Sequence, residues 1–251
     1  METNHSRGLG PEAMDYLCIR HQIYDLLRRL FIEEPTPELL SLVQKGGKGV
    51  RTDFPCGLEH AVQGSLDRII GALSGRSLSA CDSDYEDIHW DFTRLFIGPQ
   101  VPVAPPWESC YVGEGLLFQE CTRSVEEYYR AHGFRLKGCE FEAADHVGFE
   151  LDFIFALSGA VLQTATLSAL AQSDAEPVLI DAGLLIGSAD SQLDFIRRHL
   201  MVFVDQFGQK ISRHASTQYY KEIGTFLPMF IQYDESRLSC LVQDLEVCLA
   251  S

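Results

Sequence analysis

The chain has few basic side chains for its length. Of its 251 residues, 20 are Lys or Arg and 36 are Asp or Glu, which gives a formal net charge of −16. Nucleic acids and anionic membrane surfaces are recognised mainly through basic patches. The charge balance therefore argues against either of them as a main partner, while it permits a cationic partner.

Two cysteine signatures and a leader segment are also missing. None of the eight cysteines forms a Cys-x-x-Cys pair, so the motifs of zinc ribbons and thioredoxin-type proteins are absent. The first eleven residues are polar and contain glycine, without the apolar segment that is typical of a secretory signal. We expect free and mostly buried thiols in a reducing cytoplasm, and a flexible tail over residues 1–11.

Strict alternation of polar and apolar residues, the pattern of half-buried strands, is nearly absent, and only residues 178–180 form a short β-like run. Apolar residues instead recur at spacings of three and four, which predicts one all-α domain of about nine to eleven helices over residues 12–251. The apolar stripes run over Met14–Phe31, Leu58–Leu73, Ile88–Phe96, Leu117–Tyr128, Leu193–Ile211, Tyr219–Ile231 with an interruption at Pro228, and Leu238–Cys248.

Three glycines stand where helices are expected to end: Gly75, Gly98 before a proline, and Gly133. Residues 133–144 are a candidate hinge between two helices. The 19 residues from Phe153 to Ala171 carry no charge and approach the length of a membrane span. Because this stretch contains several Ser, Thr and Gln side chains, we interpret it as a central helix of the bundle.

Acidic residues gather in two regions. Residues 138–196 contain ten Asp or Glu and no Lys or Arg, and residues 82–91 contain five acids. Two of those five, Asp82 and Asp84, suit the N-terminal positions of a helix. The remaining charge either forms a solvated face or provides a negative field that steers a cationic ligand.

Residues 139–153 carry the densest set of reactive side chains. A metal site of Glu142, His146 and Glu150 is one interpretation, although no fourth ligand follows at a recognisable spacing. A nucleophile pair of Cys139 and His146 is a second, but no oxyanion-binding motif accompanies it. The third and favoured interpretation makes Asp145 a helix N-cap and His146 a structural or ligand-contacting residue.

A proline-rich segment covers residues 98–115. Four prolines within eight residues, Pro99, Pro102, Pro105 and Pro106, exclude a helix and hold the chain extended. Aromatic residues surround these prolines and lie near acids: Phe92, Phe96, Trp107 and Tyr111. A stiff loop of this kind suits the capture of a peptide with apolar and cationic side chains, whereas the alternative is that the aromatics are ordinary core residues.

These segments contain three recognisable motifs. The first is Leu95-Phe96-Ile97-Gly98-Pro99 followed by Ala104-Pro105-Pro106-Trp107-Glu108-Ser109-Cys110-Tyr111, and the second is Glu142-Ala143-Ala144-Asp145-His146. A weaker third comprises His199-Leu200, Phe203, Phe207 and Tyr219-Tyr220. Together they resemble the TorD/DmsD/NarJ family of redox-enzyme maturation chaperones over roughly residues 15–233. The chain departs from the family pattern at Ala143, where a proline is usual, and at Phe203, where a tryptophan is usual.

The resemblance implies an all-helical cytoplasmic chaperone that is not an enzyme and carries no cofactor or metal. Such a protein binds the twin-arginine signal peptide, the apo form, or both, of a molybdenum-cofactor oxidoreductase; it assists cofactor insertion and delays export. Carried over by position, the expected peptide contacts are Phe92, Leu95, Phe96, Trp107, Glu108, Tyr111, Asp145 and His146. The residues expected to shape the loop are Gly98, Pro99, Pro105 and Pro106.

In this interpretation, an acidic rim binds the arginines of the peptide and an aromatic groove binds its apolar part. The resemblance also implies a monomer or a domain-swapped dimer, with residues 133–144 as the hinge, and no insertion into a membrane. Two alternatives stay open at this point. One is a metal- or thiol-dependent hydrolase that uses Cys139, Glu142 and His146, and the other is a helical adaptor that binds a folded partner.

Overall fold

The structure, a computed structural model, describes residues 9–45, 60–98, 101–112, 120–136, 142–171 and 182–250. These residues form α-helices and three short π or 3-10 turns, without a β-strand, which confirms the all-α prediction. The elements are α1 (Pro11–Ile32), α2 (Pro37–Gln44), α3 (His60–Leu73), α4 (Ser83–Phe92), η1 (Thr93–Ile97), η2 (Glu108–Cys110), α5 (Glu120–Ala131), α6 (Val147–Ala171), α7 (Ala182–Phe195), η3 (Ile196–Leu200), α8 (Met201–His214) and α9 (Gln218–Ala250).

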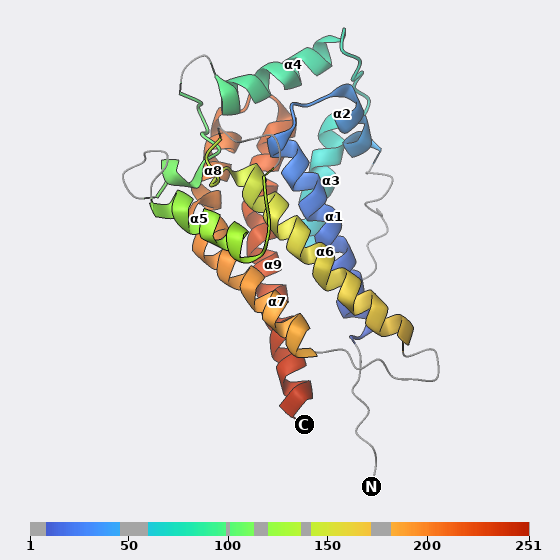
Figure 1. The fold of residues 1–251 in the computed structure, drawn as a ribbon. Helices are drawn as coiled ribbons and strands as arrows, with labels where there is room; N and C mark the ends of the chain where they lie inside the picture. Colours follow the sequence, from blue (N-terminus) through green and yellow to red (C-terminus); the bar gives the residue numbers. More distant parts are fainter. Residues whose placement is uncertain are drawn as a thin grey trace.

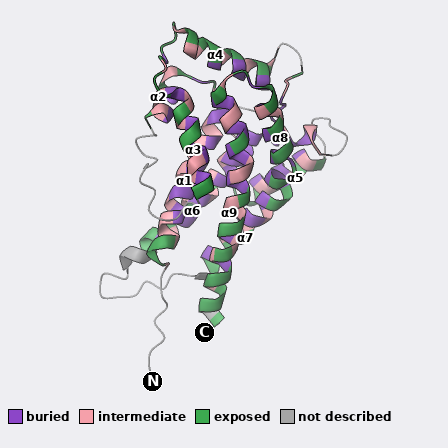
Figure 2. Cartoon of the chain, turned by 180° about the vertical axis from the view of Figure 1, so that it is seen from behind, coloured by how far each residue is buried: buried purple, intermediate pink, exposed green. Residues whose placement is uncertain are grey.

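The long helices run along the length of the molecule (Figure 1). Helix α1 packs along α6, and α9 packs against α3, α7 and α8. Helix α4 lies across the end of the bundle that is opposite the C-terminus (Figure 1). Buried residues concentrate where the long helices meet, while exposed residues dominate the C-terminal end of α9 (Figure 2).

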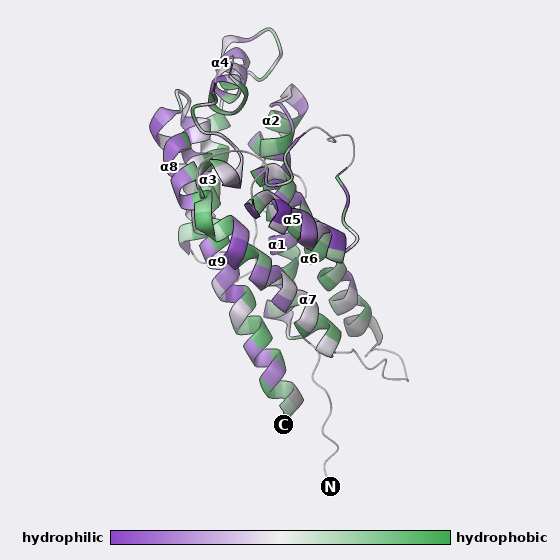
Figure 3. Cartoon of the chain, turned by 60° about the vertical axis from the view of Figure 1, so that its left-hand side comes forward, coloured by the Kyte–Doolittle hydropathy of each residue, from purple (hydrophilic) through white to green (hydrophobic). Residues whose placement is uncertain are grey.

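The apolar core has two parts. The larger cluster contains residues of α1, α2, α3, α4, the loop after η1, α5, α6, α8 and α9. It includes most of the buried aromatic side chains. The smaller cluster lies among α1, α6, α7 and α9, around Leu17, Val161, Leu193 and Leu238. Hydrophilic residues gather on α5 and on the outer side of α8 (Figure 3). The helices are therefore amphipathic and share one buried interior, as their periodicity predicts.

The uncharged stretch of the sequence belongs to α6. By length and composition, residues Val147–Leu167 could cross a membrane, but half of that window is buried within the protein. The helix packs more extensively on α1 than on any other element. Its apolar character is thus explained by its place within the bundle, as we expected.

The three predicted glycine stops are present. Gly75, Gly98 and Gly133 have φ values of +72°, +59° and +66°, in the region that side chains with a Cβ atom rarely adopt. Each follows the last turn of a helical segment, so these positions end α3, η1 and α5 as expected. Residues 1–8 of the predicted tail and residues 137–141, the centre of the predicted hinge, lie outside the described residues, as do the β-like run at 178–180 and Leu58 and Leu117, and the predictions for them stay untested. Pro11, the last residue of the predicted tail, already belongs to α1.

Pro228 does not interrupt the last helix, which corrects our expectation. Helix α9 continues through it as one element of 33 residues. Gly208 of α8 lies against the Gly224 carbonyl and the Pro228 ring, and a Cβ atom at Gly208 would come within 3.1 Å of that ring. Packing against α8 thus offsets the missing backbone donor, which sequence periodicity alone could not reveal.

Helix α2 is absent from the predicted stripes. Thr36 caps it by accepting a hydrogen bond from the Leu39 N–H at 3.2 Å, and Pro37 occupies its first position. This Thr-Pro start is a recognisable helix signal that the apolar pattern of so short a segment does not show.

The cysteines are less buried than predicted. Cys18, Cys81, Cys110, Cys121 and Cys240 carry free thiols. Cys81 and Cys240 are exposed, and the other three are half-buried. The apolar stripes themselves are filled by larger side chains, and Cys81 and Cys110 lie outside the α-helices.

A buried charge network joins three helices. The Asp234 carboxylate of α9 accepts hydrogen bonds from Arg20 Nε at 2.7 Å and from the hydroxyl groups of Tyr16 and Tyr24 at 2.7 and 2.8 Å. Arg20 Nη1 donates to Gln192 of α7 at 2.6 Å. Both side chains of the ion pair are fully buried, so each depends on the other for compensation.

We predict that Asp234→Ala lowers the free energy of unfolding by about 3–5 kcal/mol, because it leaves the Arg20 charge buried without its partner. The control is Glu235→Ala on the same helix, which removes a partly exposed pair with Arg197 and should cost about 0–1 kcal/mol. Urea denaturation of both variants measures the difference. Equal losses would contradict a dominant role for the buried pair.

Candidate functional site

The proline-rich loop lies directly on the start of α6. The Glu108 N–H donates to the Asp145 carbonyl at 2.9 Å, and the Val147 N–H donates to the Pro106 carbonyl at 2.7 Å. These two bonds form a single antiparallel bridge between Trp107 and His146. The two motifs found in the sequence are therefore one structural unit.

The Asp145 side chain strengthens this unit. Its carboxylate accepts hydrogen bonds from the Ser109 N–H and from the Thr122 hydroxyl, each at 2.9 Å. Asp145 is fully buried. We had predicted that Asp145 caps α6. It does not, because its side-chain oxygens accept hydrogen bonds from the loop and from α5. The ring nitrogen Nδ1 of His146 accepts from the Gly148 N–H at 3.1 Å instead.

Trp107 and His146 form the accessible part of the bridge. Both side chains are half-buried, and their rings meet edge to face with centroids 5.7 Å apart. Burial lowers the pKa of His146 to about 4, although the neighbouring Asp145 opposes this effect. His146 is therefore neutral near pH 7. The indole N–H of Trp107 is buried and finds no acceptor among the described residues.

Beneath the loop, Glu108 faces inward. Its carboxylate contacts Nδ1 of His199 at 2.9 Å, and Nε2 of His199 contacts the Ser124 hydroxyl at 3.2 Å. Glu108 and His199 are 1% and 3% exposed, so this contact lies in the interior. Glu108 and Asp145 stay predicted peptide contacts, and the structure shows both carboxylates hydrogen-bonded inside the protein.

Glu150 lies within the same interior. It is fully buried, and neither of its oxygens has a hydrogen-bond donor within the described part of the chain. Burial raises the pKa of Glu150 well above its ordinary value, and the nearby charges of Glu108 and Asp145 raise it further. Burial and these two charges therefore favour the protonated form of Glu150.

The apolar residues before the loop fill the core. Phe92, Leu95 and Phe96 are 4%, 0% and 5% exposed. The Phe96 ring packs against those of Phe207 and Tyr220, with centroids 6.0 and 5.7 Å apart. Peptide contact by these three side chains stays a prediction, and the structure shows them as packing residues.

Tyr111 occupies the border between the core and the surface. Its half-buried ring packs against Phe203 with centroids 5.8 Å apart, and Lys210 Nζ lies 4.5 Å from the centre of the ring. Burial raises the pKa of the Tyr111 hydroxyl, which has no partner among the described residues. Together with Trp107 and His146, Tyr111 is one of the predicted peptide contacts with a partly accessible side chain.

The residues expected to shape the loop have definite roles. Gly98 ends η1, where its N–H donates to the Thr93 carbonyl at 2.6 Å. Pro105 and Pro106 are buried residues of the loop, and the Pro106 carbonyl accepts the hydrogen bond from the start of α6. Pro99 lies outside the described residues.

The predicted metal site is not formed among the described residues. No group of three His, Cys, Asp or Glu side chains there could hold a metal ion. Glu142 is exposed, whereas Glu150 is buried. Cys139 lies outside the described residues, so its predicted pairing with His146 stays untested.

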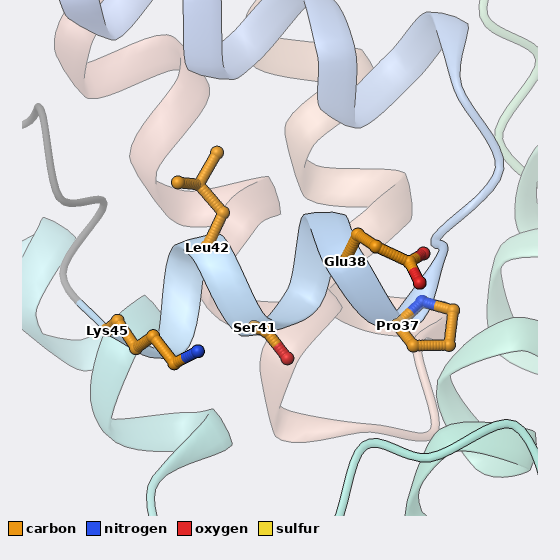
Figure 4. Close-up of a pocket in the computed structure, with 5 residues that line it drawn as sticks. All are labelled: Pro37, Glu38, Ser41, Leu42 and Lys45. Atoms are coloured by element: carbon orange, nitrogen blue, oxygen red, sulfur yellow. The ribbon is translucent and has the colours of Figure 1, made fainter.

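The described surface also has three cavities. One of about 460 Å³ is lined by four residues of the short helix α2 and by the residue that follows it: Pro37, Glu38, Ser41, Leu42 and Lys45 (Figure 4). A second of about 430 Å³ lies between the start of α1 and the end of α9. The third, of about 570 Å³, lies between α4 and the turn that joins α8 to α9.

Some residues of this site were not predicted, and Glu150 was predicted only in another role, as a candidate metal ligand. Thr122, Ser124 and Glu150 complete the hydrogen-bonding and charge environment of Asp145 and Glu108. His199 belonged to the weak third motif but was not assigned to the site. Its position on an otherwise apolar helical stripe was the available signal, because a polar side chain on a buried face needs a buried partner.

The sequence profile described as the nitrate reductase delta subunit matches residues 57–209, more than half of the chain. Curated relatives are also similar along nearly their whole length. The chaperone protein TorD of Vibrio cholerae serotype O1 is 26% identical over 229 residues, which cover 90% of this chain and 94% of the relative. That of Aliivibrio salmonicida is 26% identical over 218 residues, with 86% and 92% covered.

The chain belongs to the nitrate reductase delta subunit family, the TorD/NarJ group that the sequence motifs resemble. The curated relatives carry the name of a chaperone.

We predict that Glu150→Gln changes how stability depends on pH. Because folding raises the pKa of Glu150, its protonated form stabilises the fold fully at low pH, and this contribution is lost as the pH rises above about 4.3, the ordinary glutamate value. The glutamine variant cannot ionise at this position. Its stability relative to the wild type should therefore increase from about pH 5 to about pH 8 in urea denaturation. A constant difference would contradict the buried proton, and Glu126→Gln on exposed α5 is the control.

We predict that Asp145→Ala lowers stability by about 1–3 kcal/mol, because the buried Ser109 N–H loses its acceptor. Limited proteolysis should cut the variant more rapidly within residues 101–112, whereas its helix content by circular dichroism should be unchanged. The matched control is Glu126→Ala, which removes one exposed carboxylate from α5. Unchanged proteolysis of the Asp145 variant would show that the loop does not depend on this contact.

Proposed function

We propose that this protein is a cytoplasmic maturation chaperone for a molybdenum-cofactor oxidoreductase, and that it binds the twin-arginine signal peptide of that enzyme's precursor. The family and its chaperone relatives support the general role. By binding the signal peptide or the apo form, the chaperone delays export and assists cofactor insertion, while it carries no cofactor itself. It acts as a monomer or as a domain-swapped dimer that exchanges elements about residues 133–144.

The observation that carries this proposal is the docked loop. The paired backbone bonds and the Asp145 carboxylate fix a segment that presents the half-buried rings of Trp107, His146 and Tyr111. Trp107 and Tyr111 each have a polar atom without a partner in the described structure. An extended peptide that lies along this loop would supply apolar contacts to the accessible parts of these rings.

The neutral state of His146 also suits an apolar ligand. A charged imidazole would resist transfer away from water, whereas the neutral ring can pack against an apolar peptide segment. The apolar residues Phe92, Leu95 and Phe96, which precede the loop, are buried in the core. In this proposal Asp145 and Glu108 position the binding surface, and the accessible rings contact the apolar part of the signal peptide.

The hydrolase alternative has little in its favour. The Nδ1 atom of His146 accepts a hydrogen bond from the Gly148 N–H, and Glu142 is exposed in the segment before α6. The adaptor alternative differs from the chaperone proposal in its ligand, which would be a folded protein. Binding of an isolated signal peptide therefore distinguishes the two.

We predict micromolar binding of a synthetic signal peptide from a molybdoenzyme encoded nearby, measured by calorimetric titration. Changing both peptide arginines to alanine should weaken binding more than tenfold, which corresponds to about 1.4 kcal/mol. Replacing Trp107 with Ala should weaken binding of both peptides, because its ring contacts the apolar segment that they share. Binding of neither peptide to the wild-type protein would contradict recognition of the signal peptide.

A further inference from the structure

The cavity between α4 and the turn before α9 has properties that the docked loop does not explain. It has a volume of about 570 Å³, and α4 contributes Asp87 and Trp90 to its lining. The Trp90 side chain is 69% exposed, an unusual position for a large aromatic residue. Asp87 and Trp90 are three residues apart on a helix, so they lie on the same face.

The charged side chains that line this cavity differ in whether another group of the protein neutralises them. Arg76 forms an ion pair with Asp84 at 2.9 Å, and Arg94 forms one with Asp91 at 2.7 Å. The Asp91 carboxylate also accepts hydrogen bonds from the backbone N–H groups of Ser216 and Thr217. Both arginines are therefore neutralised by carboxylates of the protein itself.

Asp87 differs from these residues. It is exposed, and it forms no hydrogen bond or ion pair with any other described residue. The cavity thus offers one uncompensated carboxylate beside one exposed indole ring. A planar cation satisfies both at once, because a guanidinium can stack on an aromatic face while its N–H groups donate to a carboxylate.

The buried acids of the docked loop sharpen this argument. Glu108 and Asp145, the two acids among the expected peptide contacts, are hydrogen-bonded inside the protein and lie away from solvent. An arginine of a bound peptide needs another carboxylate, and Asp87 is accessible. The cavity also lies beside η1, because Thr93 and Arg94 of η1 line it. The same helical segment leads into the loop.

We propose that the cavity formed by Asp87 and Trp90 binds an arginine side chain of the client signal peptide, an inference that rests on the function proposed above. The guanidinium stacks on the Trp90 ring and pairs with the Asp87 carboxylate. The apolar part of the peptide then continues toward the docked loop. An inorganic anion is the competing ligand, but it would have to displace the carboxylates that hold Arg76 and Arg94.

The test compares Asp87→Asn and Trp90→Leu with the wild type in calorimetric titrations of two peptides. One peptide carries both arginines, and in the other both are alanine. Each variant should bind the arginine peptide about tenfold more weakly, and neither should bind the alanine peptide more weakly than the wild type does. The control is Glu86→Gln, which removes an equal charge from an exposed position of α4 outside the cavity lining and should leave binding unchanged.

A second readout locates the contact. In protein labelled with ¹⁵N at tryptophan, the chain gives two indole signals, from Trp90 and Trp107. The arginine peptide should shift both signals, and the alanine peptide should shift that of Trp107 alone. Affinities of the two cavity variants within twofold of the wild type would overturn the inference while leaving signal-peptide binding intact.

Three other outcomes also overturn this inference. Equal weakening by Glu86→Gln would show long-range attraction to the acidic helix instead of a site. A shift of the Trp90 signal by inorganic phosphate, without one by the arginine peptide, would show an anion site. If the wild type binds neither peptide, the function proposed above fails, and this inference fails with it.

Discussion

The Asp145 carboxylate is the contact on which the functional surface depends. It joins the loop, α5 and the start of α6 through hydrogen bonds from the Ser109 N–H and the Thr122 hydroxyl. The flanking backbone bonds set the register of the bridge between Trp107 and His146. A loop rich in proline cannot form a regular ladder, so side-chain acceptors such as this one replace it.

The interior beneath the loop concentrates charge in an unusual way. Glu108, Asp145 and Glu150 lie together, and His199 is the imidazole that contacts Glu108. Burial and the neighbouring acids raise the pKa of Glu150 and so favour its protonated form, which reduces the repulsion among the three acids. The signature acids of the sequence therefore build the site from the inside, while the exposed carboxylate on α4 remains available for ligands.

Much of the fold could be predicted from the sequence, because apolar periodicity and helix-ending glycines act locally. Gly75, Gly98 and Gly133 end their helices as expected, and the proline-rich segment is an ordered loop in the part that the structure describes. Other features depend on contacts distant in sequence. The continuation of α9 through Pro228 requires Gly208 on α8, and the π turns at η1 and η3 have no simple periodic signal.

The site was only partly predictable for the same reason. Sequence motifs identified Trp107, Glu108, Asp145 and His146, and the structure brings these residues together. The motifs could not show that Glu108 points inward, because an acid in a loop is normally exposed and its partner His199 lies 91 residues away along the chain. Trp90 carried no motif, and its exposure on α4 becomes visible only in three dimensions.

Hydrogen–deuterium exchange of the protein with and without a twin-arginine signal peptide tests the central claim most directly. The account predicts slower exchange of backbone amides in residues 101–112 and at the start of α6, with added protection in α4. Other helices should exchange as they do in the free protein. Unchanged exchange in the loop, together with protection confined to another face such as the C-terminal half of α9, would contradict the assignment of the docked loop as the peptide-binding surface.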